Sequence, residues 1–80
     1  MLTKEEKVYF ERELLEYFER EHKWATNALD RKRDAPWEII HNAKQRMLGL
    51  CYFWQDCGMD YDYIEKIYNI YKERLEDLLK

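Results

Sequence analysis

Apolar side chains recur along this chain at intervals of three, four and seven residues, with charged side chains filling most positions between them. The first row consists of Val8, Leu15, Phe18, Ala25 and Leu29. This spacing keeps apolar groups on one face of an α-helix, so the sequence predicts a helix over residues 4–33. A second apolar row flanks the first: Phe10, Leu14, Tyr17, Trp24 and Ala28. A face this wide is typical of a helix in a bundle, because a two-stranded coiled coil needs only a narrow seam.

The same period continues in two further segments. One row advances by steps of three and four: Ile40, Ala43, Met47, Leu50, Trp54 and Cys57. The last row has similar steps: Ile64, Tyr68, Tyr71, Leu75 and Leu78. These rows predict helices over residues 36–57 and 61–80.

Helix start and stop signals stand at the ends of the three rows. Thr3 and Glu6 have the spacing of a capping box, which begins a helix. Pro36 is well tolerated in a first helical turn, and the residue before it avoids the helical region. Gly58 supplies a left-handed stop, and Asp60 is a good N-cap for the third helix.

The predicted fold class is all-α: a small antiparallel three-helix bundle with a long first helix, in one domain over residues 1–80. Both connections are only a few residues long, so neighbouring helices must run in opposite directions. The expected core has nine members: Leu15, Phe18, Met47, Leu50, Trp54, Ile64, Tyr68, Tyr71 and Leu75. Gly49 lies inside the second predicted helix, which predicts a close approach of another helix at that point.

Composition excludes several classes of protein. Charged residues make up 39% of the chain, and no apolar run approaches the ~18 residues that a membrane span needs. The first residues lack the pattern of a signal peptide, so we expect a cytoplasmic protein. Cys51 and Cys57 are too far apart on one helix for a disulfide, and neither they nor His22 and His41 have the spacing of a metal site. We therefore expect no cofactor and no metal.

Charge is distributed unevenly along the chain. Residues 1–21 hold four basic and seven acidic side chains, net −3, whereas residues 22–46 hold six basic and three acidic ones, net +3. The basic residues predicted to gather where the first helix meets the second are Lys23, Arg31, Lys32, Arg33, Lys44 and Arg46. Such a corner is a candidate site for an anion or nucleic acid. Complementarity to the helix dipoles explains the same pattern without a ligand, and the acidic total of −3 disfavours nucleic acid.

Aromatic residues are more numerous than a core of this size accommodates. The chain has three Trp, seven Tyr and three Phe, and several of them, including Trp37, Tyr52 and Phe53, lie off the predicted stripes. The first helix should also project beyond the others at its N-terminal end, because it is about 30 residues long against ~20–22. The predicted partner-binding residues lie on and beside this projection: Val8, Tyr9, Phe10, Leu14 and Tyr17.

The leading functional hypothesis is a non-enzymatic protein–protein interaction module, which binds a protein partner or a second copy. Small acidic helical proteins of this kind are common among phage and mobile-element products, where some act as inhibitors or regulators by occupying a partner's surface. The first alternative is a nucleic-acid or anion binder that uses the basic corner. The second is a small helical enzyme. The chain is similar in size to the three-helix chorismate mutases and shares a long first helix with them, but its basic residues do not follow an inward face.

Overall fold

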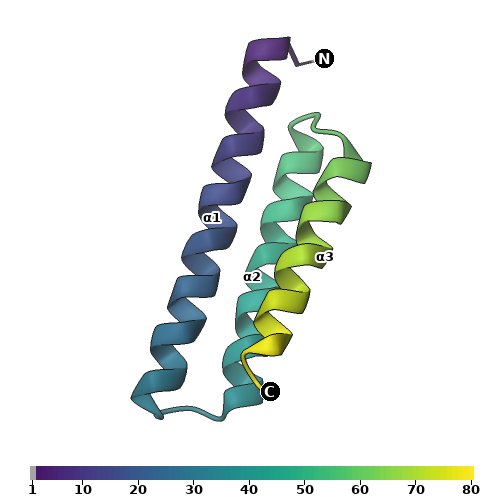
Figure 1. Ribbon diagram of the computed structural model, residues 1–80. Helices are drawn as coiled ribbons and strands as arrows, with labels where there is room; N and C mark the ends of the chain where they lie inside the picture. Colours follow the sequence, from purple (N-terminus) through teal and green to yellow (C-terminus); the bar gives the residue numbers. More distant parts are fainter. Residues whose placement is uncertain (1) are drawn as a thin grey trace.

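The computed structural model describes residues 2–80, which form three α-helices joined by short turns. The helices are α1 (Lys4–Arg31), α2 (Pro36–Asp56) and α3 (Tyr61–Asp77). Figure 1 shows that each helix runs opposite to the one before it, so that α2 and α3 lie side by side and α1 packs along them. The predicted all-α fold is confirmed, and its Cα atoms extend over 44 × 17 × 16 Å.

The predicted start and stop signals set the helix ends. Thr3 and Glu6 form the full capping box, with N–O distances of 3.1 Å in both directions. The Asp60 carboxylate accepts a hydrogen bond from the Asp62 amide at 3.1 Å and caps α3. Gly58 adopts φ +97°, the left-handed backbone that glycine permits without strain. These three signals therefore set the start of α1, the end of α2 and the start of α3.

All three helices end before their predicted last residues, α1 by two, α2 by one and α3 by three. α1 ends at Arg31 because Lys32 turns into the left-handed region, with φ 55° and ψ 31°. Ala35 is extended, as the residue before a proline must be, so only three residues separate the end of α1 from Ala35. At the C-terminus, the amides of Leu78 and Leu79 donate to carbonyls three residues back, which tightens the last turn and ends the α-helix at Asp77.

The core lies where the three apolar stripes meet. Six of the nine predicted core residues are buried: Phe18, Met47, Trp54, Ile64, Tyr71 and Leu75. Leu15, Leu50 and Tyr68 are partly buried and pack against this core from its edge. On α1, Leu14 of the flanking row is completely buried together with Phe18 and Ala25 of the first row, so the core draws on both rows.

The close approach predicted at Gly49 is absent within the described residues. A Cβ atom built on Gly49 meets no heavy atom within 4 Å beyond its own helical neighbours, and the residue is exposed. Packing within the described bundle therefore does not explain a glycine inside α2, where it weakens the helix by about 1 kcal/mol relative to alanine.

The first helix is the longest, as predicted. At 28, 21 and 17 residues, α1, α2 and α3 are about 42, 31 and 26 Å long at 1.5 Å per residue. Figure 1 shows the first turns of α1 continuing past the turn between α2 and α3. Leu2 extends back to that turn, where its Cγ atom lies 3.7 Å from the position of a Cβ built on Gly58.

Candidate functional site

An aromatic cluster centred on Trp54 joins α1 to α2. The Trp54 ring lies 5.8 Å from Phe10, 6.0 Å from Tyr17 and 4.7 Å from Phe53, measured between ring centroids. Tyr9 extends the cluster through an edge contact with Phe10 at 5.6 Å. Trp54 is buried, and its Nε1–H has no hydrogen-bond acceptor among the described residues. The rings around it are far more accessible.

These accessible rings continue along the α1–α2 seam. A hollow beside the cluster is lined by Tyr17, Glu21, Arg46, Gly49 and Leu50. At its far side the Arg46 guanidinium stacks on the Trp24 ring, 4.0 Å from the centroid, and its Nε donates to Glu21 at 2.8 Å. Aromatic and apolar side chains thus follow one another along the C-terminal half of α2.

We call this surface the aromatic face. Its members are Tyr9, Phe10, Tyr17, Trp24, Leu50 and Phe53. Tyr9 and Phe53 are half exposed, at 50% and 54%, whereas Tyr17 and Trp24 are 36% and 40% exposed. Exposed apolar surface that is contiguous in this way usually marks an interaction site.

The five residues predicted to bind a partner do not lie on one surface of the structure. Tyr9, Phe10 and Tyr17 belong to the aromatic face. Leu14 is completely buried in the core, so its assignment to a partner-binding surface was wrong. Val8 is 58% exposed on the projecting turns, one helical position away from Tyr9, and it lies outside the aromatic face.

The sequence did not place Trp24, Leu50 and Phe53 at this site. A signal for them existed. Tyr17 and Trp24 are seven residues apart and Leu50 and Phe53 are three apart, so each pair lies on one face of its helix. Only the side-by-side packing of α1 and α2 shows that the two pairs face the same seam.

The structure does not gather the six basic residues predicted at the helix junction. Lys44 pairs with Glu76 of α3 at 3.8 Å, whereas Arg46 turns to α1 and pairs with Glu21. Two residues apart on a helix, these side chains point in opposite directions. Lys23 is exposed two turns before the end of α1. Arg31, Lys32 and Arg33 remain as an exposed basic group at the junction.

A small hollow at this junction connects the basic group to the aromatic face. It is lined by Trp24, Ala28, Arg31, Arg33 and Asp34. The indole of Trp24 is therefore shared between the two features. An acidic side chain, Asp34, stands among the arginines, which weakens the case for an anion site at this corner.

Polar side chains occupy the seam between α1 and α3. The Glu19 carboxylate accepts hydrogen bonds from the Tyr71 hydroxyl and from the Arg74 guanidinium, the latter at 2.9 Å. These bonds hold the pKa of Glu19 below its usual range, with the Tyr71 bond the largest cause. His22 lies nearby, and partial burial lowers its pKa. The polar groups of this network thus satisfy one another within the fold.

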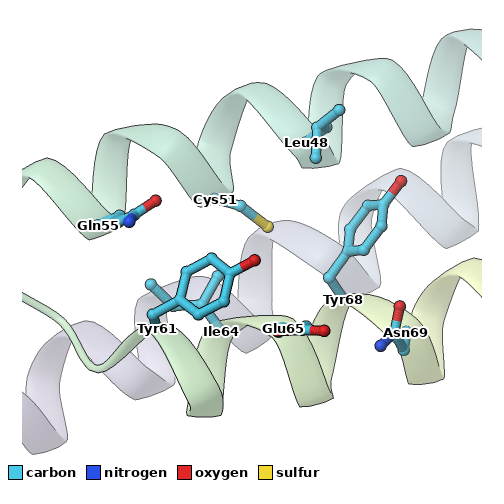
Figure 2. Close-up of a pocket in the computed structure, with 8 residues that line it drawn as sticks. All are labelled: Leu48, Cys51, Gln55, Tyr61, Ile64, Glu65, Tyr68 and Asn69. Carbon is cyan, nitrogen blue, oxygen red and sulfur yellow. The ribbon is translucent and has the colours of Figure 1, made fainter.

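A third surface feature is the hollow of about 230 Å³ between α2 and α3. Figure 2 shows the Cys51 sulfur pointing into the space between the rings of Tyr61 and Tyr68. Burial raises the pKa of this thiol to about 11, so it stays protonated at neutral pH and is a poor nucleophile and metal ligand. The hollow is smaller than the ~300–1,000 Å³ of typical small-molecule sites, and no Lys, Arg or His lines it.

Within residues 2–80, no three His, Cys, Asp or Glu side chains lie close enough together to hold a metal ion. In the same part of the chain, no helix has the length and apolar character that crossing a membrane requires.

No protein-family model matches the sequence, and comparisons with curated proteins and with solved structures find no match either. Function is therefore inferred from the geometry of the surface alone.

Proposed function

We propose that this protein is a non-enzymatic interaction module that binds a helix of a protein partner along the α1–α2 seam. The aromatic face carries this proposal. Tyr17, Gly49 and Leu50 line a hollow in the seam, and the exposed rings of Trp24 and Phe53 belong to the same face. An amphipathic helix binds an apolar surface of this kind by placing its own apolar residues against it.

The chemistry of the face supports binding over catalysis. Tyr and Trp supply large, stiff contact area with a polar tip, and they are enriched at the energetic centres of protein interfaces. Groups with shifted pKa values such as Glu19 in the α1–α3 network and Cys51 in the α2–α3 hollow lie off the aromatic face. In this proposal the protein regulates or inhibits its partner by covering a surface, with no reaction of its own.

A photo-crosslinking experiment tests the proposal with a matched control. Phe53 and Tyr52 are adjacent in sequence and similarly exposed, at 54% and 60%. Phe53 faces the seam, whereas Tyr52 lies near Tyr68 on the α3 side. A benzophenone side chain at position 53 should cross-link a protein in purified samples or in source-cell extract, and one at position 52 should not.

The cross-linked product must also compete away with unlabelled wild-type protein but not with the Phe53→Glu variant. Equal cross-linking from positions 52 and 53, or none from either, would contradict a binding role for the aromatic face.

A further inference from the structure

The ends of the aromatic face carry opposite charge. One row on α1 advances by steps of seven, four, seven and seven, through Glu6, Glu13, Tyr17, Trp24 and Arg31. Residues at such steps lie on the same side of a helix. The row therefore begins with carboxylates, passes through two rings of the aromatic face and ends with a guanidinium.

Neighbouring residues strengthen this polarity. Lys32 and Arg33 are exposed beside Arg31 at the basic end, where three basic side chains outnumber the one carboxylate among them, Asp34. Asp56, at the C-terminus of α2, is exposed at the acidic end, since α2 runs opposite to α1.

We infer that the partner helix belongs to a second copy of this chain, bound face to face in an antiparallel, two-fold symmetric dimer. The inference rests on the proposed function, because it names the occupant of the same face. A two-fold axis across the seam brings the acidic end of each copy against the basic end of the other. Parallel pairing would instead bring like charges together at both ends.

Gly49 lies near the middle of the seam, where such an axis would pass. It shares the central hollow with Tyr17 and Leu50, and the space that a Cβ on it would occupy is open to 4 Å beyond its own helical neighbours. Helices approach most closely where one presents a glycine. A crossing with α2 of the second copy gives this glycine the packing role that its own bundle does not.

The aromatic face is long enough for a helix of a second copy to cross it near its middle. Its members on α1 run from Tyr9 to Trp24, which is about 22 Å at 1.5 Å per residue. Face-to-face pairing would cover the rings of Tyr9 and Phe53, which are half exposed in the single chain.

Sedimentation velocity over a concentration series tests the dimer. Wild type should sediment as a dimer at high concentration, and Phe53→Glu should raise the dissociation constant at least about tenfold, as expected for a central interface residue. Tyr52→Glu is the control and should dimerise like wild type. A wild-type protein that stays monomeric throughout the series would overturn the inference.

Charge exchange tests the antiparallel arrangement. The first variant changes the acidic end with Glu6→Lys, because Glu6 lies on the other side of Tyr17 along α1 from Arg31 and at a comparable distance. Glu6→Gln, which preserves the capping box, is its control. The second changes the basic end, with Arg31→Glu and Arg33→Glu. Each variant alone should dimerise more weakly than wild type, and an equal mixture should form a heterodimer with near wild-type affinity. If the mixture dimerises no more tightly than either variant alone, the charges stabilise only the helix dipoles, and the inferred antiparallel arrangement is wrong.

Gly49→Gln separates stability from association. Glutamine favours the helix and has open space at its Cβ, so the melting temperature of the dilute monomer should rise while dimerisation weakens. Unchanged dimerisation would exclude a crossing at Gly49.

If cross-links from position 53 join a different protein while wild type remains monomeric, the second copy is excluded and the proposed function stands. Absence of position-specific cross-links together with a monomer would exclude both.

Discussion

The two seams that α1 makes with its neighbours have opposite chemistry. Toward α3, Tyr71 and Arg74 donate to Glu19, Arg74 also stacks over the Tyr71 ring at 4.8 Å, and Phe18 packs against that ring from the core at 5.4 Å. Toward α2, the outer surface is a row of half-exposed rings. A seam that serves only the fold satisfies its polar groups and covers its apolar ones within the chain. The α1–α2 seam does not, which is why the binding proposal is placed there.

The largest expected effect comes from removing the ring on which the aromatic face rests. Trp54→Ala should destabilise the fold by about 3–5 kcal/mol, because it removes a buried indole and leaves a cavity beneath Phe10, Tyr17 and Phe53. Urea unfolding followed by circular dichroism measures this loss.

Two variants sharpen the Trp54 prediction. Trp37→Ala should change stability by less than about 0.5 kcal/mol, since Trp37 is 67% exposed. Trp54→Phe should cost clearly less than Trp54→Ala, because it keeps an aromatic ring and removes a buried N–H that has no acceptor in the described residues. Equal losses from Trp54→Ala and Trp37→Ala would show that α1 and α2 do not pack through this cluster.

A smaller loss of stability is expected from a substitution in the α1–α3 seam. Tyr71→Phe keeps the contact with Phe18 and removes the hydroxyl that donates to Glu19. The loss should be about 1 kcal/mol, the usual net worth of one hydrogen bond. Dimerisation should not change, because the α1–α3 seam lies off the aromatic face. A change in dimerisation as large as that of Phe53→Glu would remove the distinction between the two seams.

The smallest effect is a dependence on pH. The pKa of Glu19 is lowered in the folded protein by Tyr71 and then by Arg74, so the unfolded chain takes up a proton first as the pH falls. The stabilisation from this network is therefore fully present above the usual carboxylate range, and it is lost as the pH falls through the folded pKa of Glu19.

Comparison with Tyr71→Phe isolates this contribution. The stability difference between wild type and the variant should narrow on acidification below the carboxylate range. His22 faces the same network, and its lowered pKa gives a separate loss of stability that begins at a higher pH, as the unfolded histidine becomes protonated. A constant difference between wild type and Tyr71→Phe at all pH values would mean that the Glu19–Tyr71 bond has no energetic role.

The parts of the fold that sequence predicts best are those fixed by local chemistry. Thr3, Pro36, Gly58 and Asp60 each act on the backbone within a few residues, so the helix ends beside them can be predicted from the local sequence. Apolar periodicity likewise identifies Phe18 and most other core residues. Local chemistry does not say which members of two adjacent apolar rows face the centre of the bundle. Leu14 was therefore predicted on the surface although it is completely buried, and Leu15, predicted in the core, is only partly buried.

The candidate site was harder to predict because it is formed by two helices at once. Lys44 and Arg46 are close in sequence to the helix junction, but helical geometry sends them to α3 and α1. Phe53 is visible in the sequence as an aromatic residue off the stripe, yet its neighbours Phe10 and Tyr17 come from another helix. Their combination into one face depends on the packing of α1 against α2, which no local pattern encodes.

The buried thiol in the α2–α3 hollow has a consequence for kinetics. Only 7% of Cys51 is exposed, whereas Cys57 is partly exposed at the end of α2. A thiol reagent should therefore modify Cys57 in the closed protein and Cys51 far more slowly, with the reaction of Cys51 accelerated whenever α3 moves away from α2. The ratio of the two labelling rates reports how often the bundle opens along that seam, with Cys57 as the internal reference. The native cysteines thus make the local breathing of this small domain measurable without any engineered probe.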